Sequence, residues 1–125
     1  MAALIAGLAR DDDLSGLRIT VQIPGAVDGP SAGGVICLGI LSALEGRPLP
    51  KDFAFTGTIL PDGTIGQVGG IVHKMQAAHD GDCKRVIVPD FLRLQEDMNT
   101  HKSVDLRRLA RKPVICPPVR VFAPR

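Results

Sequence analysis

The chain has 125 residues, of which 45% are apolar, 22% charged and only 3% aromatic, and its formal net charge is +2. This length and apolar content predict one folded domain with a single core and exclude a disordered chain. A charge so close to balance does not favour a nucleic-acid-binding protein, which needs a clustered basic face. With neither Trp nor Tyr in the chain, its core has to be built mainly from aliphatic side chains.

The first element is a short apolar helix expected over residues 1–10. It lacks a basic start and runs into three aspartates, so it resembles neither a signal peptide nor a membrane span. The three cysteines, Cys37, Cys83 and Cys116, are an odd number without zinc-site spacing, and their positions predict buried free thiols. We therefore expect a cytoplasmic protein with no membrane association.

The next two elements bracket a glycine-rich loop. Residues 17–23 (LRITVQI) alternate apolar and polar side chains, a pattern typical of a half-buried strand. Residues 31–45 form a strongly apolar stretch that predicts a central helix, which ends at Gly46 and is followed by prolines.

The middle of the chain predicts a hairpin followed by a helix and a strand. Strands are expected over 53–59 and 64–68, joined by the turn residues 61–63 (PDG). A helix is then expected over 70–80, and a fourth strand over 84–89.

The last part of the chain carries weaker signals. It predicts a short helix over 91–98 and at most a short edge strand over 119–121. This mixed order of helices and strands, with a hairpin, predicts one α+β domain spanning 1–125.

Ser31 stands where the loop DGPSAGG becomes the apolar helix. A serine at a helix start commonly caps the helix with its hydroxyl. The same position suits a nucleophile, because the free N–H groups of a helix start stabilise an oxyanion. Gly29, Gly33 and Gly34 remove side chains, so that a substrate backbone is able to approach. Local chemistry favours the cap but leaves both roles open.

Lys74 lies on the expected helix 70–80, between Ile71 and Ala78 on a stripe that also includes Met75. One interpretation is that its stem covers apolar surface while the ammonium reaches water. The other is a partly buried amine, whose charged form is disfavoured by desolvation and which then accepts a proton from a serine hydroxyl.

Other constellations are weaker. The histidines at 73, 79 and 101 show no metal spacing, and solvated surface positions are expected for them. The stretch GTIGQVGG follows neither the dinucleotide-binding pattern nor the P-loop pattern, so the chain predicts no nucleotide cofactor of its own.

Several motifs in order resemble the proteolytic domain of Lon proteases. They are DGPSAGG before an apolar helix, FTGTILPDGTIGQVGGIVHKMQAA, and KRVIVP, and the resemblance is strongest over 17–89. The family carries a PSAG serine, a TG strand and a Gly-Gly-x-x-x-Lys helix start. The resemblance implies a mixed sheet with packed helices, and a catalytic dyad of Ser31 and Lys74.

The same resemblance implies further roles and partners. Thr56 matches a family threonine that positions the lysine amine. Asp28 matches an acidic position beside the family serine, and the alternative role for Asp28 is turn formation. It implies peptide-bond hydrolysis in unfolded or damaged proteins, and a ring-shaped homo-oligomer that is commonly hexameric. No Walker motif occurs in the chain, so ATP would act only through an ATPase module supplied elsewhere.

Three departures from the family pattern leave a second hypothesis open. Thr58 stands where many ATP-dependent members carry Glu, the tail 99–125 diverges, and the strands that family domains carry ahead of the first helix have no counterpart. The alternative is therefore a catalytically silent Lon-like interaction domain of a larger ATPase system. Retention of both Ser31 and Lys74 favours the peptidase.

Overall fold

The computed structural model describes residues 1–125 except 28, 90–93, 97–99, 101, 106–113 and 116–125. Its elements are α1 (Ala2–Arg10), the 3-10 helix η1 (Pro30–Ala32), α2 (Gly33–Glu45), β1 (Phe53–Phe55), β2 (Thr58–Ile59), β3 (Ile65–Gly66), α3 (Ile71–Asp80), β4 (Arg85–Ile87), β5 (Leu94–Glu96), β6 (Ser103–Asp105) and β7 (Val114–Ile115). The predicted mixed α+β class is confirmed.

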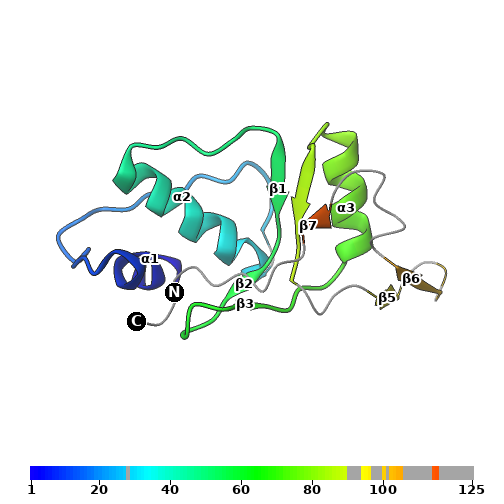
Figure 1. Cartoon of the computed structure of the whole chain (residues 1–125), viewed down its shortest axis with the longest axis horizontal. Helices are drawn as coiled ribbons and strands as arrows, with labels where there is room; N and C mark the ends of the chain where they lie inside the picture. The colour runs from blue at the N-terminus through cyan, green and yellow to red at the C-terminus, as the bar shows by residue number, and fades with distance from the viewer. Residues whose placement is uncertain (28, 90–93, 97–99, 101, 106–113, 116–125) are drawn as a thin grey trace.

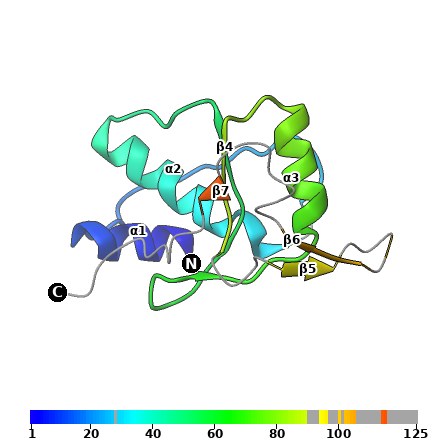
Figure 2. The ribbon, with the colours of Figure 1, turned by 45° about the vertical axis from the view of Figure 1, so that its right-hand side comes forward.

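A three-stranded parallel sheet stands at the centre of the molecule. Its order is β1-β4-β7, and the chain crosses from β1 to β4 through the β2–β3 hairpin and α3. Parallel neighbours require such a crossover, because the chain leaves one strand at the opposite end from where it must enter the next. Helices α1 and α2 lie on one side of this sheet and α3 on the other (Figures 1 and 2).

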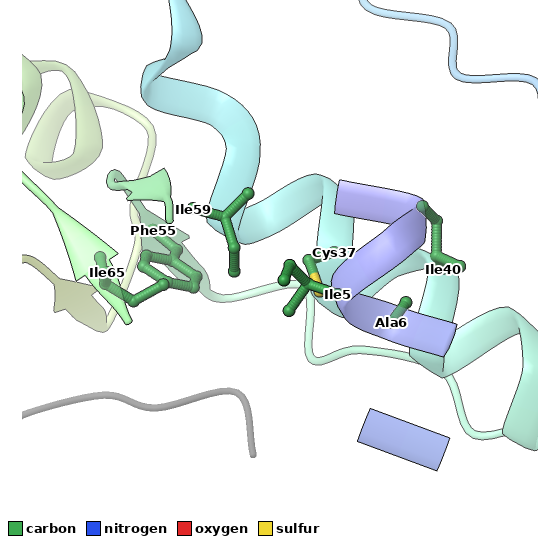
Figure 3. Close-up of a cluster of buried hydrophobic side chains, with 7 residues drawn as sticks. All are labelled: Ile5, Ala6, Cys37, Ile40, Phe55, Ile59 and Ile65. Carbon is green, nitrogen blue, oxygen red and sulfur yellow. The ribbon is translucent and has the colours of Figure 1, made fainter. Parts of the chain in front are cut away.

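The main core lies between α1, α2 and the strands β1 to β3. It is aliphatic apart from one phenylalanine and one cysteine, and Figure 3 shows its members: Ile5, Ala6, Cys37, Ile40, Phe55, Ile59 and Ile65. Cys37 is fully buried, as predicted, and burial raises the pKa of its thiol. Cys83 is a half-buried free thiol, whereas Cys116 lies outside the described residues.

A second, smaller core fixes α3. Ile71 and Met75 on one face of the helix pack with Val88, which directly follows β4. Both cores together confirm the prediction that aliphatic side chains carry the packing of this chain.

The predicted strand over 17–23 is wrong: the structure assigns no strand to these residues. A strand requires a backbone partner as well as an alternating pattern. Within the part of the chain that the structure describes, residues 18–23 have no backbone hydrogen bond to another segment.

The predicted strand over 53–59 is divided into β1 and β2, because the chain changes partner at Thr56 and Gly57. The Thr56 N–H still donates to the Ile87 oxygen at 3.1 Å, in line with the β1–β4 pairing. The Gly57 N–H instead donates to the Ser31 oxygen, and β2 then pairs with β3.

The helix predicted over 91–98 is wrong where the structure describes it. Leu94–Glu96 form β5 and pair antiparallel with Ser103–Asp105, so partner strands override the weak local preference. Val114–Ile115 form a strand beside β4 that the sequence did not predict. The expected edge strand over 119–121 lies outside the described residues.

Candidate active site

A cavity of about 230 Å³ lies where η1, β1, β4 and α3 meet. Three of the four site residues expected from the sequence line it, namely Ser31 from η1, Thr56 directly after β1, and Lys74 from α3. The remaining lining residues are small or apolar: Ala32, Ala54, Phe55 and Val86. The fourth expected residue, Asp28, lies outside the described residues.

Ser31 occupies the middle of the single turn η1, after Pro30 at its first position. The N-cap of α2 is Ala32, and among the described residues no side chain caps either η1 or α2. The interpretation of Ser31 as a helix cap is therefore wrong, because the 3-10 turn moves the start of the α-helix beyond it. Ser31 is half-buried and lines the cavity.

Gly57 fixes the turn that carries Ser31 by two backbone hydrogen bonds. Its N–H donates to the Ser31 carbonyl oxygen at 2.8 Å, and its own carbonyl oxygen accepts from the Gly34 N–H at 3.0 Å. The backbone N–H of the residue before it, Thr56, donates to the carbonyl oxygen of Ile87, the last residue of β4. The backbone positions of the serine turn and of Thr56 are thus fixed by the same few residues.

Glycine at these positions serves close packing. A Cβ atom at Gly34 would lie 2.7 Å from the Phe55 ring, and one at Gly57 would lie 2.3 Å from Ile65 Cγ2. At Gly33 it would lie 3.0 Å from the Ile59 nitrogen. The expectation that Gly33 and Gly34 clear space for a substrate is therefore wrong, since both face β1 and β2.

Lys74 lies on α3 beside its buried stripe. Ile71, Met75 and Ala78 are all buried, as predicted, and Lys74 is partly buried between them and solvent. The adjacent residue on the same helix, His73, is exposed. Lys74 therefore lies at the edge of the small core and lines the cavity.

The cavity has an asymmetric charge. Among the described residues Lys74 is the one charged residue that lines it, and none of the described carboxylates does so. Among the described residues no salt bridge or side-chain hydrogen bond involves Ser31, Thr56 or Lys74. Such bonds are often absent in a substrate-free site and form only with substrate bound.

Metal chemistry finds no support in the part of the chain that the structure describes. These residues contain no group of three or more His, Cys, Asp or Glu side chains that could hold a metal ion. His73 and His79 are exposed on α3, as expected, and His101 lies outside the described residues.

Sequence reasoning missed Gly57 as the residue that fixes the serine turn. It also missed Ala54, Phe55 and Val86 as the apolar wall of the cavity. The available signal was the FTG motif, in which a glycine interrupts an otherwise regular strand pattern.

The fold brings together three polar residues that are far apart in the sequence. Ser31, Thr56 and Lys74 line one small cavity of a mixed α+β domain. The chain matches the Lon protease C-terminal proteolytic domain over residues 7–104 and belongs to that family.

Individual relatives agree with this assignment. The chain is 43% identical over 93 residues to the Lon protease of Vibrio parahaemolyticus, covering 71% of this chain and 12% of that protein. It is 39% identical over 84 residues to the archaeal Lon protease of Methanocaldococcus jannaschii, covering 65% and 13%. For the Lon protease of Escherichia coli K12 the identity is 43% over 74 residues, covering 57% and 9%.

The chain spans about a tenth of the length of these curated relatives. In the described ranges no helix has the length and apolar character that crossing a membrane demands.

Proposed function

We propose that the chain is a serine-type endopeptidase domain in which Ser31 is the nucleophile and Lys74 the general base. The observation that carries this proposal is the common cavity of Ser31, Thr56 and Lys74, in a chain that belongs to the Lon proteolytic family. The residues come from three separate elements, so their proximity results from the tertiary fold.

The proposed reaction proceeds through an acyl-enzyme. Ser31 Oγ attacks the carbonyl carbon of the scissile peptide bond while its proton passes to the neutral amine of Lys74. Collapse of the tetrahedral intermediate breaks the C–N bond, and Lys74 returns the proton to the leaving amine. Water then attacks the ester, gives a proton to Lys74, and the released Ser31 oxygen takes that proton back.

The described surroundings of the base are largely apolar. Apart from Ser31 and Thr56, the other described residues that line the cavity with Lys74 are all apolar. In our proposal Thr56 Oγ1 orients the Lys74 amine. Asp28 is the supporting acidic residue that precedes the serine. The oxyanion is stabilised by N–H groups near Ser31, although the Gly34 N–H is already bonded to Gly57.

The substrate class and partners follow from the family. We propose unfolded or damaged polypeptides as substrates, and a homo-oligomeric ring, commonly a hexamer, as the assembly. No cofactor takes part in the proposed chemistry, and ATP acts only through an ATPase module outside these residues. The free thiols of Cys37 and Cys83 fit a reducing, cytoplasmic compartment.

The test is cleavage of a fluorescently labelled unfolded casein between neutral and mildly alkaline pH. Ser31→Ala should lower the rate at least about a thousandfold, because the nucleophile is lost. Lys74→Arg should lower it nearly as much, since arginine stays charged and accepts no proton.

Matched controls are Ser15→Ala and Lys51→Arg, which change exposed residues outside the cavity. Both should retain full activity. Cleavage that persists in either Ser31→Ala or Lys74→Arg would contradict the dyad. A folded wild-type protein that cleaves nothing would instead favour the silent interaction domain.

A further inference from the structure

Phe55 connects the main core with the cavity. It is the last residue of β1, is 9% exposed, and lies beside Ile59 and Ile65 in the cluster of Figure 3. Among the described residues it is the one member of that cluster that also lines the cavity of Ser31 and Lys74. A change in the position of its ring therefore affects the packing of the core and the shape of the cavity together.

The Phe55 ring occupies the space that two glycines leave by having no side chain. A Cβ atom at Gly34 would lie 2.7, 3.1 and 3.2 Å from its Cζ, Cε1 and Cε2 atoms, and one at Gly57 would lie 3.3 Å from Cε2. The outer edge of the ring thus lies directly against the backbone of both glycines. Carbon atoms in contact need about 3.5–4.0 Å, so a side chain at position 34 does not fit while the ring stays in place.

The same two glycines determine where Ser31 lies. The Gly34 N–H donates to the Gly57 oxygen at 3.0 Å, and the Gly57 N–H donates to the Ser31 oxygen at 2.8 Å. The other end of the Phe55 side chain is fixed separately, because its backbone belongs to β1 and is paired with β4. The ring is therefore a spacer between the strand that leads into Thr56 and the turn that carries Ser31.

We propose that Phe55 is a positioning residue for the proposed reaction, in which its ring sets the distance of Ser31 from Thr56 and Lys74. This role rests on the proposed peptidase function and is exerted through Ser31. A misplacement of about 1 Å in an active site can lower the rate about a hundredfold. A methyl group at position 34 requires a shift of this order, from 2.7 Å to at least about 3.5 Å from the ring.

The test exchanges volume between the ring and Gly34 in the full chain. Phe55→Leu removes Cζ, Cε1 and Cε2, the three ring atoms that a Cβ at Gly34 would meet. At matched folded fraction it should lower kcat for casein about tenfold and change KM less than about twofold, because the nucleophile is displaced while substrate binding is kept. Gly34→Ala should also lower kcat at least about tenfold, although alanine is the better helix former.

The decisive measurement is the double variant that combines Phe55→Leu with Gly34→Ala. The added methyl group then enters the space that the three ring atoms have left, and kcat should return to within about threefold of the wild type. If the ring only stabilises the fold, the two changes should add and the double variant should be the least active. A double variant no better than the weaker of the two single variants would overturn the proposal.

Phe53→Leu is the matched control for loss of aromatic volume on the same strand. Phe53 begins β1 and packs against the main core, but it does not line the cavity. Its substitution should leave kcat within about twofold of the wild type at matched folded fraction. An equal loss in Phe53→Leu and Phe55→Leu would assign the effect to general loosening of β1, which contradicts a specific role of Phe55.

A second readout does not depend on peptidase activity. Amide hydrogen exchange of Gly57, followed by NMR, reports on the bond from its N–H to the Ser31 oxygen. Relative to amides in the middle of α2, exchange should be at least about tenfold faster in Gly34→Ala and should return towards the wild-type rate in the double variant.

The exchange result separates failure of this role from failure of the peptidase function. Unchanged exchange of Gly57 in Gly34→Ala would overturn the placement of Ser31 by the ring, even in an active enzyme. A wild-type protein that cleaves nothing but shows the expected exchange pattern would contradict the peptidase function, while supporting the placement of Ser31 by Phe55.

Discussion

The two sides of the cavity are fixed in different ways. On the serine side, backbone hydrogen bonds from Gly57 set the position of Ser31, and glycines allow close contact with the strands. On the lysine side, α3 is fixed by the packing of Ile71 and Met75 against Val88. Hydrogen bonds depend on direction and are lost with small displacements, whereas apolar packing tolerates repacking.

This difference has a consequence for how each side should respond to substitution. Loss of packing volume on the lysine side should reduce stability more than it changes geometry. Added volume on the serine side should displace the nucleophile even where the domain still folds. Measuring unfolding and casein cleavage together in Ile71→Ala and in Gly57→Ala separates these two responses.

The largest loss of stability is expected from Ile71→Ala. Ile71 is 1% exposed, and truncating a buried isoleucine to alanine typically costs about 2–5 kcal/mol, of which we expect about 3 kcal/mol here. Urea unfolding followed by circular dichroism measures the change. The folded fraction should keep measurable cleavage activity, because α3 can repack around Met75.

The control for this prediction is His73→Ala on the exposed face of the same helix, which should change stability by no more than about 0.5 kcal/mol. A similar loss in both variants would show that α3 is fixed by something other than its small core.

Gly57→Ala should cost about 1–3 kcal/mol and lower activity far more than Ile71→Ala does. The added methyl group would lie 2.3 Å from Ile65 Cγ2, so the chain must shift where it bonds to Ser31. Casein cleavage at matched folded fraction measures the activity. Gly39→Ala in α2, where a Cβ meets no atom within 4 Å, should leave stability unchanged or raise it.

A double variant makes this test sharper. Ile65→Ala removes Cγ2, the nearest atom that a side chain at position 57 would meet, so Gly57→Ala should cost less in that background. Additive costs would contradict the clash as the cause.

The sequence predicted those parts of the molecule whose signals are local. The structure confirms α3, which was predicted from the helical periodicity of Ile71 and Met75. It also confirms the end of α2, which was predicted from Gly46. The ordered motifs also led to the family, and to three residues that line one cavity. Their catalytic roles stay predictions.

Other features depend on partners that a single segment does not specify. Residues 17–23 and 53–59 are both predicted as strands, yet within the described residues only the second has a neighbouring strand, in β4. The position of Ser31 on a 3-10 turn depends on bonds to Gly57, which lies 26 positions further along the chain. Local patterns predict which residues are able to form a strand or cap, and long-range contacts decide which of them do.

The smallest effect is expected where the two sides are joined, at the start of β1 and β4. The Asp52 carbonyl oxygen accepts from the Lys84 N–H at 2.7 Å, and its carboxylate pairs with Lys84 and Arg85 at 3.6 and 3.4 Å. Desolvation raises the pKa of Asp52, but its backbone hydrogen bond and the Arg85 guanidinium outweigh this and lower it overall. Exposed pairs of this kind contribute little and are screened by salt.

Asp52→Asn should therefore lower Tm less than Gly57→Ala does, and only at a pH where the carboxylate is ionised. Because the folded pKa lies below the ordinary value of 3.8, the stabilisation is present above that pH and is lost as the pH falls through the folded value. Thermal unfolding of both proteins from pH 7 down to acid should show their Tm difference vanish. The absence of any Tm difference between pH 7 and acid would assign the connection between the two sides to the Asp52 backbone alone, which the substitution leaves in place. A non-zero difference that stays constant with pH would contradict an ionic origin.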